Sequence, residues 1–523
     1  ENAFAHSNWT PPSTTTLLTS LYESVHGVNR ENISVPDTVT TVAKALGRFG
    51  YTSGFWSANG LVSIETNYSK DFDYAYQLSD AYQDIRERNR LPVSQLYVWR
   101  LVNRLSQQLY PNWQNNPQGS APFPPPIATL KVLNASLEHL FNEVGVDKGV
   151  GVDQTNKTKA KRGGWVREIK TFDEGYFLRN ARYRAQKADW MHKNVRAYLS
   201  YMTARPGYDP RRNKFFLYLH YFDPHAPYRP PPRYRRVFDP NFRGRYVTRR
   251  PGEKKMCQDG GEGLSVSKCY ADNYWATRTE GPLDNRSLRN MVAQYDGEIL
   301  FLDHFLGKLV QLLKKKGLFE NTLLVITSDH GEAFYEHKTY GHGNNLYQEE
   351  VHIPLIVTWP RGLSRGVRLS DPVGLVDIMP TVLEAVGVPT VPCMQGRSLL
   401  GVIRGTEHRK ELYGETEYYN KTQVFLVRDH RKLIYVGSGG LRLPPRPQPQ
   451  SKYLFDLKAD PGETLNLLAW GLDPATAVVV KSMQGALDRR YKVVRQACRF
   501  HRPTEAEMSP ELERRLKALG YVN

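Results

Sequence analysis

Residues 323–337 read LLVITSDHGEAFYEH. Residues 323–327 form a short, continuously apolar run, which is typical of a strand buried in a parallel sheet. Asp329 and His330 follow directly, and ligands of open α/β sheets bind beyond the carboxyl ends of the strands. A carboxylate and an imidazole at such a turn can share one divalent cation. For this pair taken alone, a capping aspartate and a surface histidine are the simpler alternative.

Other segments extend this pattern into an α/β fold. The runs FFLYLH (215–220) and LIVT (355–358) resemble the first strand in length and apolar character. A helix is predicted over 38–48 with Asp37 as its cap, followed by a strand over 53–57. Strands that alternate with helices predict a layered α/β fold, with a sheet flanked by helices.

The strongest helical pattern lies over residues 287–316. Apolar residues recur there at alternating steps of four and three, which predicts one continuous buried stripe. The helix is expected to end at three lysines and Gly317, which suit the negative end of the dipole and a left-handed cap. The stripe consists of Leu288, Val292, Tyr295, Ile299, Leu302, Leu306, Leu309 and Leu313.

The C-terminal part follows a different pattern. Short strand-like segments at 424–427, 432–436 and 453–456 predict a small antiparallel appendage, and the pattern is helical from 475 onward. We therefore expect a catalytic domain over 1–400, a small α+β subdomain over 401–470 and a helical tail over 471–523. A mostly helical, irregular insertion is expected at about 80–200.

The chain of 523 residues carries a formal charge of +18, which favours anionic partners such as sulfated or phosphorylated substrates, lipid surfaces or nucleic acid. The basic stretches 156–170 and 233–255 contain no helix-turn-helix, finger or RNP motif, so no nucleic-acid partner is predicted. They are either solvated loops or a mouth that attracts an anionic substrate. No apolar run approaches the ~20 residues of a membrane span.

Four cysteines bear on the redox compartment. Cys257 and Cys269 bracket a short Gly-rich loop that can close as a disulfide, which fits a periplasmic or extracellular setting. Cys393 and Cys498 are isolated and support no interpretation. No spacing of cysteines suggests a metal site.

The stretch NWTPPSTTTLLTS (8–20) allows two interpretations. In the first, Thr10 is a helix N-cap and Pro11 occupies the first helical position, where its absent N–H does no harm. In the second, Thr10 is a nucleophile at a helix N-terminus, where free N–H groups and the dipole attract an anion. The stretch alone does not decide between them.

Five segments together resemble the sulfatase branch of the alkaline phosphatase superfamily, in that family's order. They are TPPSTTTLLTSLYESVHGV (10–28), YLHYFDPHAPYRPP (218–231), LLVITSDHGEAFYEH (323–337), GHGNNLYQEEVHIPLIV (341–357) and LVDIMPTVLEAVGVP (375–389). The closing ELERRLKALGYV also resembles the tails of bacterial members. The resemblance implies an alkaline-phosphatase-like layered sheet and a metal-dependent ester hydrolase or transferase.

The resemblance also implies roles for five residues. Thr10 occupies the nucleophile position of the sulfatase signature, and Asp329 and His330 match metal ligands. His225 and His342 match histidines that contact the ester or the leaving group. One divalent ion is expected, with zinc, manganese and calcium all compatible with these ligands.

Departures from the sulfatase pattern shift the expected substrate. Threonine cannot yield the formylglycine of classical sulfatases, and Thr14 replaces the supporting arginine. The segment 57–60 (SANG) replaces the Gly-Lys-Trp-His of many members. A threonine nucleophile favours a phosphoester or phosphodiester, with hydrolysis and transfer both open. A sulfuric ester hydrolase that works without formylglycine and a catalytically dead anion-binding relative are the alternatives.

One family element has no counterpart in the sequence. Members of this superfamily place a strand that ends in acidic metal ligands upstream of the nucleophile, but only nine residues precede Thr10. We therefore expect that this first strand lies outside the chain. The expected substrate is an anionic ester, borne on a glycan or a lipid, in a periplasmic or extracellular, envelope-associated setting.

Overall fold

The computed structural model describes residues 1–77, 187–242, 283–418, 421–437 and 449–496, apart from positions 31, 32, 65, 227, 470 and 472. All of these residues belong to one unit. The expected insertion up to residue 186, the basic segments 156–170 and 243–255, the Cys257–Cys269 pairing and the closing motif lie outside the described residues. Cys393 is disulfide-bonded, and its partner also lies outside them.

The central strands form several small sheets. Strand β2 (Thr52–Ser57) runs parallel to both β3 (Tyr74–Gln77) and β4 (Phe215–His220). Strand β5 (Leu324–Thr327) pairs antiparallel with β9 (Leu355–Thr358), so the expected parallel pairing of this run is not what the described strands show. The shorter strands are β1 (Ala3–Phe4) between β10 (Val373–Gly374) and β8 (His352–Ile353), and the pair β6 (Ala333–Phe334) and β7 (Tyr340–Gly341).

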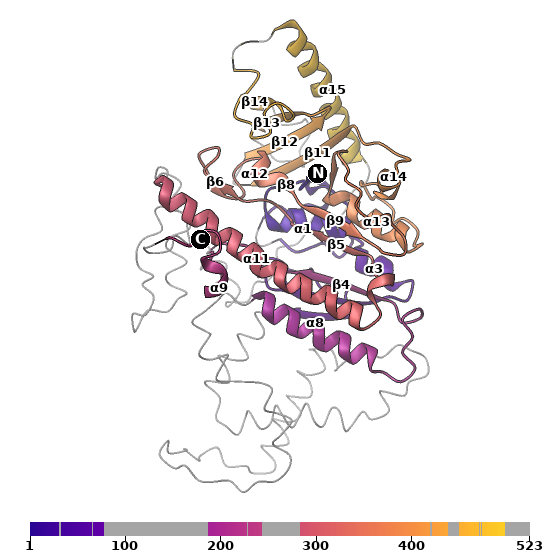
Figure 1. The fold of residues 1–523 in the computed structure, drawn as a ribbon. Coiled ribbons are helices and arrows are strands. Elements are labelled where there is room, and N and C mark those ends of the chain that lie inside the picture. Colours follow the sequence, from indigo (N-terminus) through magenta and orange to yellow (C-terminus); the bar gives the residue numbers. More distant parts are fainter. Residues whose placement is uncertain are drawn as a thin grey trace, which may run out of the picture. The chain divides into compact units, whose positions relative to one another are not determined.

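Helices cover both faces of β2, because its neighbouring side chains point to opposite sides. Trp56 contacts Tyr198 of α8 (Lys187–Thr203), with ring centroids 5.0 Å apart. Phe55 packs instead into a cluster with Leu46 of α3 (Val42–Gly47). Helix α11 (Asn285–Lys315) runs beside α8, while α1 (Thr10–Thr19) and α13 (Ile378–Ala385) pack with α3 (Figure 1). The layered α/β fold is confirmed.

The remaining helices are short. They are α2 (Glu23–His26), α9 (Pro232–Arg235), η3 (Phe319–Asn321), α12 (Gln348–Val351), η4 (Leu375–Asp377) and α14 (Leu400–Ile403). Helix α3 is shorter than predicted and its cap differs. Thr41, not Asp37, accepts a hydrogen bond from the Lys44 N–H. Asp37 precedes the helix in a turn and accepts a hydrogen bond from the Asn67 side chain.

Helix α11 begins and ends close to the predicted positions, but the predicted stripe is not its most buried face. Asp284 caps it by accepting from two backbone N–H groups, and Gly317 follows it with φ +67°. Phe301 and Phe305 are buried against α8 and α9. Ile299 of the predicted stripe is 43% exposed. The contacts of α8 and α9 therefore bury a face next to the predicted stripe, and Leu309 and Leu313 of that stripe are buried with it.

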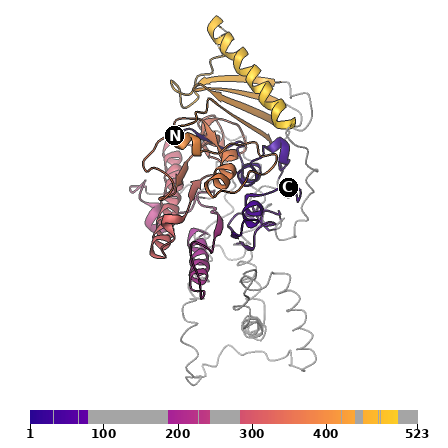
Figure 2. The ribbon, with the colours of Figure 1, turned by 90° about the vertical axis from the view of Figure 1, so that its right-hand side faces the viewer.

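The C-terminal appendage is an antiparallel sheet, as predicted. Its order is β11 (Glu411–Tyr418), β12 (Lys421–Arg428), β13 (Arg431–Gly437) and β14 (Pro449–Asp456), and β11 is the strand that the sequence pattern missed. Helix α15 (Pro474–Gln496) packs on this sheet (Figure 2), with Leu487 in the same buried cluster as Leu426 and Leu433.

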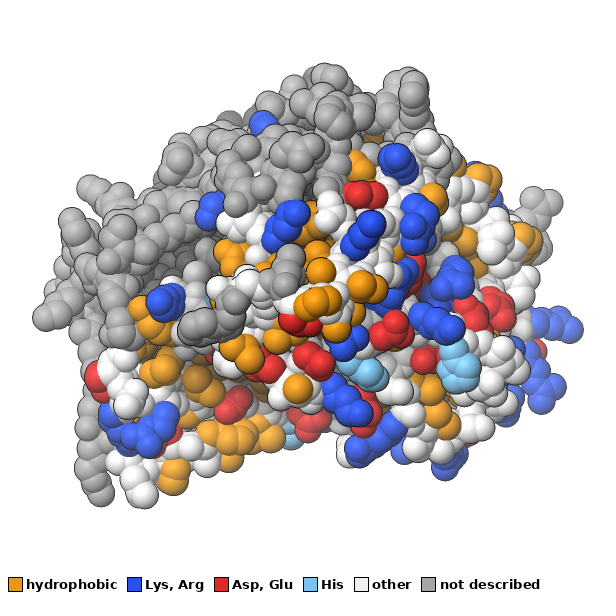
Figure 3. Space-filling model, turned by 90° about the horizontal axis from the view of Figure 1, so that it is seen from above, with side chains coloured by type: hydrophobic (Ala, Val, Ile, Leu, Met, Phe, Trp, Pro, Cys, Tyr) orange, Lys and Arg blue, Asp and Glu red, His pale blue; other side chains and the backbone are white. Residues whose placement is uncertain are grey.

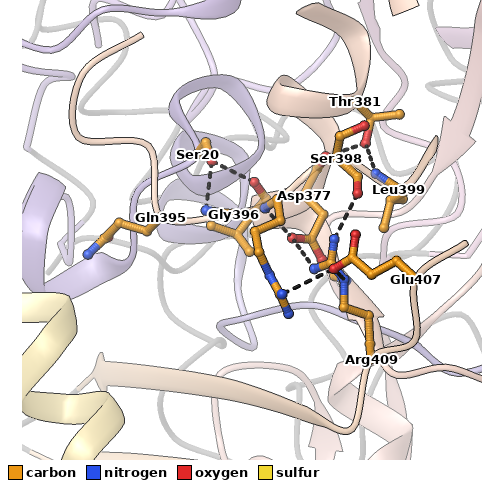
Figure 4. Close-up of polar contacts among 12 residues, drawn as sticks. Ser20, Asp377, Thr381, Gln395, Gly396, Ser398, Leu399, Glu407 and Arg409 are labelled. Carbon is orange, nitrogen blue, oxygen red and sulfur yellow. Dashed lines mark hydrogen bonds and ion pairs between the residues drawn. The ribbon is translucent and has the colours of Figure 1, made fainter. Parts of the chain in front are cut away.

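A polar network fastens the end of α1 to the segment around α13 (Figure 4). The Ser20 hydroxyl donates to the Val376 carbonyl at 2.7 Å and accepts from the Gly396 N–H at 3.1 Å. Asp377 in turn pairs with the buried guanidinium of Arg409 at 3.4 Å. Burial raises the pKa of Asp377 although Arg409 opposes the rise. The network fixes the helix whose first residue is Thr10.

Candidate functional site

Thr10 is the first residue of α1, and it is not the helix cap. Trp9 is the N-cap, and no side chain caps this helix. The two prolines that follow lack N–H groups, so the helix start offers an anion fewer donors than expected. The Thr10 hydroxyl is buried and lies 3.1 Å from His330 Nε2. The helix-cap interpretation of Thr10 is therefore wrong.

Asp329 and His330 follow β5, and they lie next to Thr10 at the carboxyl end of that strand. The Gly331 carbonyl lies 2.7 Å from His330 Nδ1, which therefore carries the ring proton. His330 Nε2 then faces the Thr10 hydroxyl. Asp329 Oδ2 is buried, lies 3.6 Å from His330 Nε2 and has no hydrogen-bond partner among the described residues.

The electrostatics of the site favour an ionised Asp329. Burial alone would raise the pKa of its carboxyl, but His330 and His220 outweigh this and lower the pKa below its ordinary value. A carboxylate that stays charged in a buried place is suited to bind a cation. Burial also lowers the pKa of His220, which favours its neutral form.

The two other predicted histidines lie next to this pair. The rings of His342 and His330 have centroids 4.2 Å apart, and those of His225 and His342 are 5.1 Å apart. His342 Nδ1 lies 3.2 Å from Glu332 Oε1, which fixes the orientation of the ring. His225 Nδ1 lies 2.7 Å from the Ala226 carbonyl. The structure thus brings together all five residues that the sequence singled out.

Sequence reasoning missed two members of the site. His220 ends β4, with its Nδ1 2.9 Å from the Tyr218 hydroxyl. The Asn59 amide lies 3.5 Å from His220 Nε2, at the start of the loop after β2. A signal was present, because His220 is the polar last residue of an apolar strand, the same position that drew attention to Asp329.

Glu350 in α12 connects the segment that precedes Thr10 with the segment that follows His342. Its Oε2 accepts hydrogen bonds from the Asn8 side chain at 3.1 Å and from the Asn344 N–H at 3.0 Å. Its backbone carbonyl accepts from the Gly331 N–H at 2.8 Å, on the turn after Asp329. A Cβ at Gly331 would collide with the Glu349 carbonyl, so this close approach requires glycine.

The donor set fits a divalent ion in kind. An ionised carboxylate oxygen without a partner and an imidazole are ligands of zinc and manganese, and the Thr10 oxygen lies beside them. In the described part of the chain no group of three His, Cys, Asp or Glu side chains is arranged to hold a metal. Glu1, the acidic residue upstream of Thr10, pairs instead with Arg368 at the surface.

The surface shows mixed charge where it is described. On the face drawn in Figure 3, Lys and Arg side chains lie interspersed with Asp and Glu. The described helices include none with the length and apolar character needed to cross a bilayer.

The fold defines a class, that of α/β proteins with an alkaline-phosphatase-like layered sheet. A phosphonate monoester hydrolase of Agrobacterium radiobacter superposes with a TM-score of 0.57 at 17% identity, covering 94% of this chain and 88% of that one. A structure solved with its substrate D-glucosamine-2-N,6-O-disulfate gives 0.56 at 16% identity, covering 94% and 90%. These likenesses carry the fold alone.

The sequence comparisons narrow the class. The family described as Sulfatase matches residues 167–388, and N-sulphoglucosamine sulphohydrolase, C-terminal matches residues 335–493. Residues 167–493 of the chain are therefore similar in sequence to sulfatases.

Two curated relatives illustrate the extent of the match. Arylsulfatase K of Homo sapiens is 30% identical over 216 residues, 39% of this chain and 38% of that protein. The multifunctional alkaline phosphatase superfamily protein PehA of Trinickia caryophylli is 29% identical over 307 residues, 54% and 55% respectively. The chain thus spans well under two thirds of either relative.

Proposed function

We propose that this protein is a phosphoric or phosphonic ester hydrolase of the sulfatase family with Thr10 as its nucleophile. The observation that supports this most is the contact of the Thr10 hydroxyl with His330 Nε2, 3.1 Å away, in place of a helix-capping bond. The hydroxyl is held at the point where an ester would meet Asp329 and three histidines. Threonine, unlike cysteine or serine, cannot become the formylglycine of classical sulfatases.

The proposed reaction proceeds in two displacements. The Thr10 oxygen bonds to phosphorus and the bond to the leaving oxygen breaks, so that the proton lost by Thr10 is balanced by the one that the leaving alcohol gains. His225 or His342 supplies that proton as the general acid. Water then attacks phosphorus, phosphate or phosphonate leaves, and the Thr10 hydroxyl is restored.

A divalent ion completes the proposal. Asp329 would hold it through Oδ2 and His330 through Nε2, and the bound ion would lower the pKa of the Thr10 hydroxyl and stabilise charge on the transferring group. Zinc, manganese and calcium remain the candidates. The ester would be anionic and borne on a glycan or lipid in an extracellular or periplasmic setting, consistent with the disulfide at Cys393.

Sulfate-ester hydrolysis without formylglycine is the second candidate. Two findings favour it. The Sulfatase match over residues 167–388 includes Asp329 and His330, and arylsulfatases are among the relatives. The same attack by Thr10 would then occur at sulfur.

Parallel assays separate the two candidates. Rates with an aryl phosphate, an aryl phosphonate monoester, an aryl phosphodiester and an aryl sulfate are measured for the wild type and for Thr10→Ala. We expect turnover of a phosphorus ester to exceed that of the sulfate, and Thr10→Ala to lose it by at least ~10³-fold. A faster sulfate reaction would establish the second candidate instead.

A matched control lies on the same helix. The buried Thr19 hydroxyl donates only to the Thr15 carbonyl and takes no part in the site, so Thr19→Ala should retain the wild-type rate. Full turnover by Thr10→Ala, with metal content and folding unchanged, would remove Thr10 from the mechanism.

A further inference from the structure

The segment that leads into α1 runs along the appendage sheet (β11–β14). The Glu415 N–H of β11 donates to the His6 carbonyl at 2.8 Å, and the Ser7 hydroxyl donates to the Thr416 hydroxyl at 2.9 Å. All four residues are buried. Polar groups that are buried in this way need their partners, so these hydrogen bonds fix the position of the segment relative to β11.

Tyr418, the last residue of β11, extends this contact to the residue before the proposed nucleophile. The rings of Tyr418 and Trp9 have centroids 4.3 Å apart, and their planes are inclined at 32°. Both side chains are buried. Trp9 is the N-cap of α1, so its position determines where the helix begins and where Thr10 lies.

The same tyrosine ring packs against the loop that follows His342. Gly343 has φ +79°, and a Cβ at this residue would lie 2.8 Å from the Tyr418 ring, closer than two carbon atoms pack. The Gly343 N–H donates to the Asn8 carbonyl at 2.9 Å, which ties this loop directly to the segment before α1. One buried ring of the appendage therefore contacts both loops that carry proposed reacting groups.

We propose that Tyr418 is a positioning residue whose ring fixes the spacing between Thr10 and His342, so that the appendage sheet helps to order the site. This inference rests on the proposed function, in which Thr10 attacks the ester and His342 is a candidate general acid. A displacement of about 1 Å between reacting groups can lower a rate by about 10²-fold. A tyrosine ring suits this role because it is rigid and has only two side-chain torsions.

Removal of the ring tests the proposal on whichever ester the wild type hydrolyses. Tyr418→Ala should lower kcat by about 10–100-fold and change KM by less than about threefold, because the reacting groups lose their alignment while the ester still binds. Tyr418→Phe keeps the ring and should hold kcat within about twofold of the wild type. Tyr418→Leu should show the same pattern as the alanine variant with a smaller loss, and it provides the test if the alanine variant does not fold.

Tyr435→Ala is the matched control. Tyr435 is a buried aromatic residue of the same sheet, and it packs in the cluster that includes Leu487 of α15. Its truncation should lower the free energy of unfolding but leave kcat per folded molecule within about twofold of the wild type. Full kcat in Tyr418→Ala, or an equal loss of kcat in Tyr435→Ala, would overturn the positioning role.

A readout that needs no turnover separates this proposal from the role of Thr10. Hydrogen exchange of the peptide that contains Gly343 reports on the hydrogen bond to the Asn8 carbonyl. Exchange should be faster by about 10-fold or more in Tyr418→Ala and unchanged in Tyr418→Phe and Tyr435→Ala. Unchanged exchange in Tyr418→Ala would overturn the proposal. Full turnover by Thr10→Ala would instead overturn the proposed function, and the exchange result would still stand.

Discussion

The appendage sheet β11–β14 and the strands around Thr10 are built from similarly apolar runs but differ in burial. In β12, six consecutive residues are buried, and the strand has a partner on each side. In β5, all four residues are half-buried, and one side has no partner in the described part of the chain. The comparison shows that an apolar run identifies a strand of the core. How deeply the strand is buried depends on whether neighbouring strands lie at both of its edges.

Substitutions in the two regions should also affect different properties: activity around Thr10, and stability in the appendage sheet. Asp329→Asn removes the charge of a half-buried carboxylate just beyond the carboxyl end of β5. Turnover and bound metal should fall by about 10³-fold, because the amide is a poor ligand and cannot balance a cation. The free energy of unfolding should fall slightly, because the lowered pKa of Asp329 means that the folded state favours its ionised carboxyl.

Metal analysis, steady-state rates and urea unfolding measure these three quantities. Asp303→Asn, at an exposed position of α11, serves as the control and should match the wild type in all of them. A variant at 329 that keeps both metal and rate would show that this strand end is no more functional than the appendage.

Core truncations probe the difference in packing. Phe425 in β12 is fully buried, and Phe425→Ala should cost about 3–5 kcal/mol of unfolding free energy. Leu219→Ala in half-buried β4 should cost clearly less, about 1–2 kcal/mol, since fewer contacts are lost. Urea unfolding compares them, and equal costs would break the comparison between the two regions.

His6 lies between the two regions, and its ionisation should make the stability of the folded protein depend on pH. Burial lowers the pKa of His6 from 6.5 to about 4, with Arg490 adding to the effect, although the Tyr413 carbonyl 2.7 Å from Nδ1 opposes it. Between pH 6.5 and about 4, His6 therefore binds a proton in the unfolded chain but stays neutral in the folded protein. Stability should be lost as the pH falls through this window, by about 1.4 kcal/mol per pH unit and about 3 kcal/mol in all.

Urea unfolding at several pH values, with His6→Gln as the comparison, measures this contribution. The variant should lose the His6 part of the slope, so that the two stability curves converge as the pH falls. Parallel curves for wild type and variant would contradict the shifted pKa.

The smallest effect is expected at the orientation of His342. Glu332→Gln weakens the contact of Oε1 with His342 Nδ1, which is 3.2 Å long. Turnover should fall by about 10–100-fold, as for other partners that orient a site histidine, with KM little changed. Steady-state kinetics decide this, and an unaltered kcat would place the pair outside the reaction.

Much of the fold was predictable because local patterns determine it. Strand β4, strand β9 and the length of α11 follow from apolar runs and helical spacing. Strand β11 was missed because its sequence, ELYGETEY, is half polar. Its Glu415 is nevertheless buried, where it accepts hydrogen bonds from the Ser24 N–H and the Tyr413 hydroxyl. Only the folded structure supplies these partners.

The site was predictable from motifs but not from composition. Thr10, His225, Asp329, His330 and His342 lie in segments that resemble a family, and the structure gathers them. His220 and Glu350 depend on contacts between residues distant in sequence, such as Asn8 with Glu350, that no local pattern contains. The helix-cap interpretation of Thr10 also failed. Thr10 satisfies the local rule for an N-cap, but its hydroxyl contacts His330 Nε2 instead of the helix backbone.

Trapping the covalent intermediate tests the nucleophile most directly. The protein is mixed with an aryl phosphate or phosphonate monoester, quenched in acid within one turnover, digested and analysed by mass spectrometry. The account predicts one phosphoryl or phosphonyl group on the oxygen of Thr10 and none in Thr10→Ala. The same group found on another side chain, or turnover with no modified peptide at any time, would contradict it.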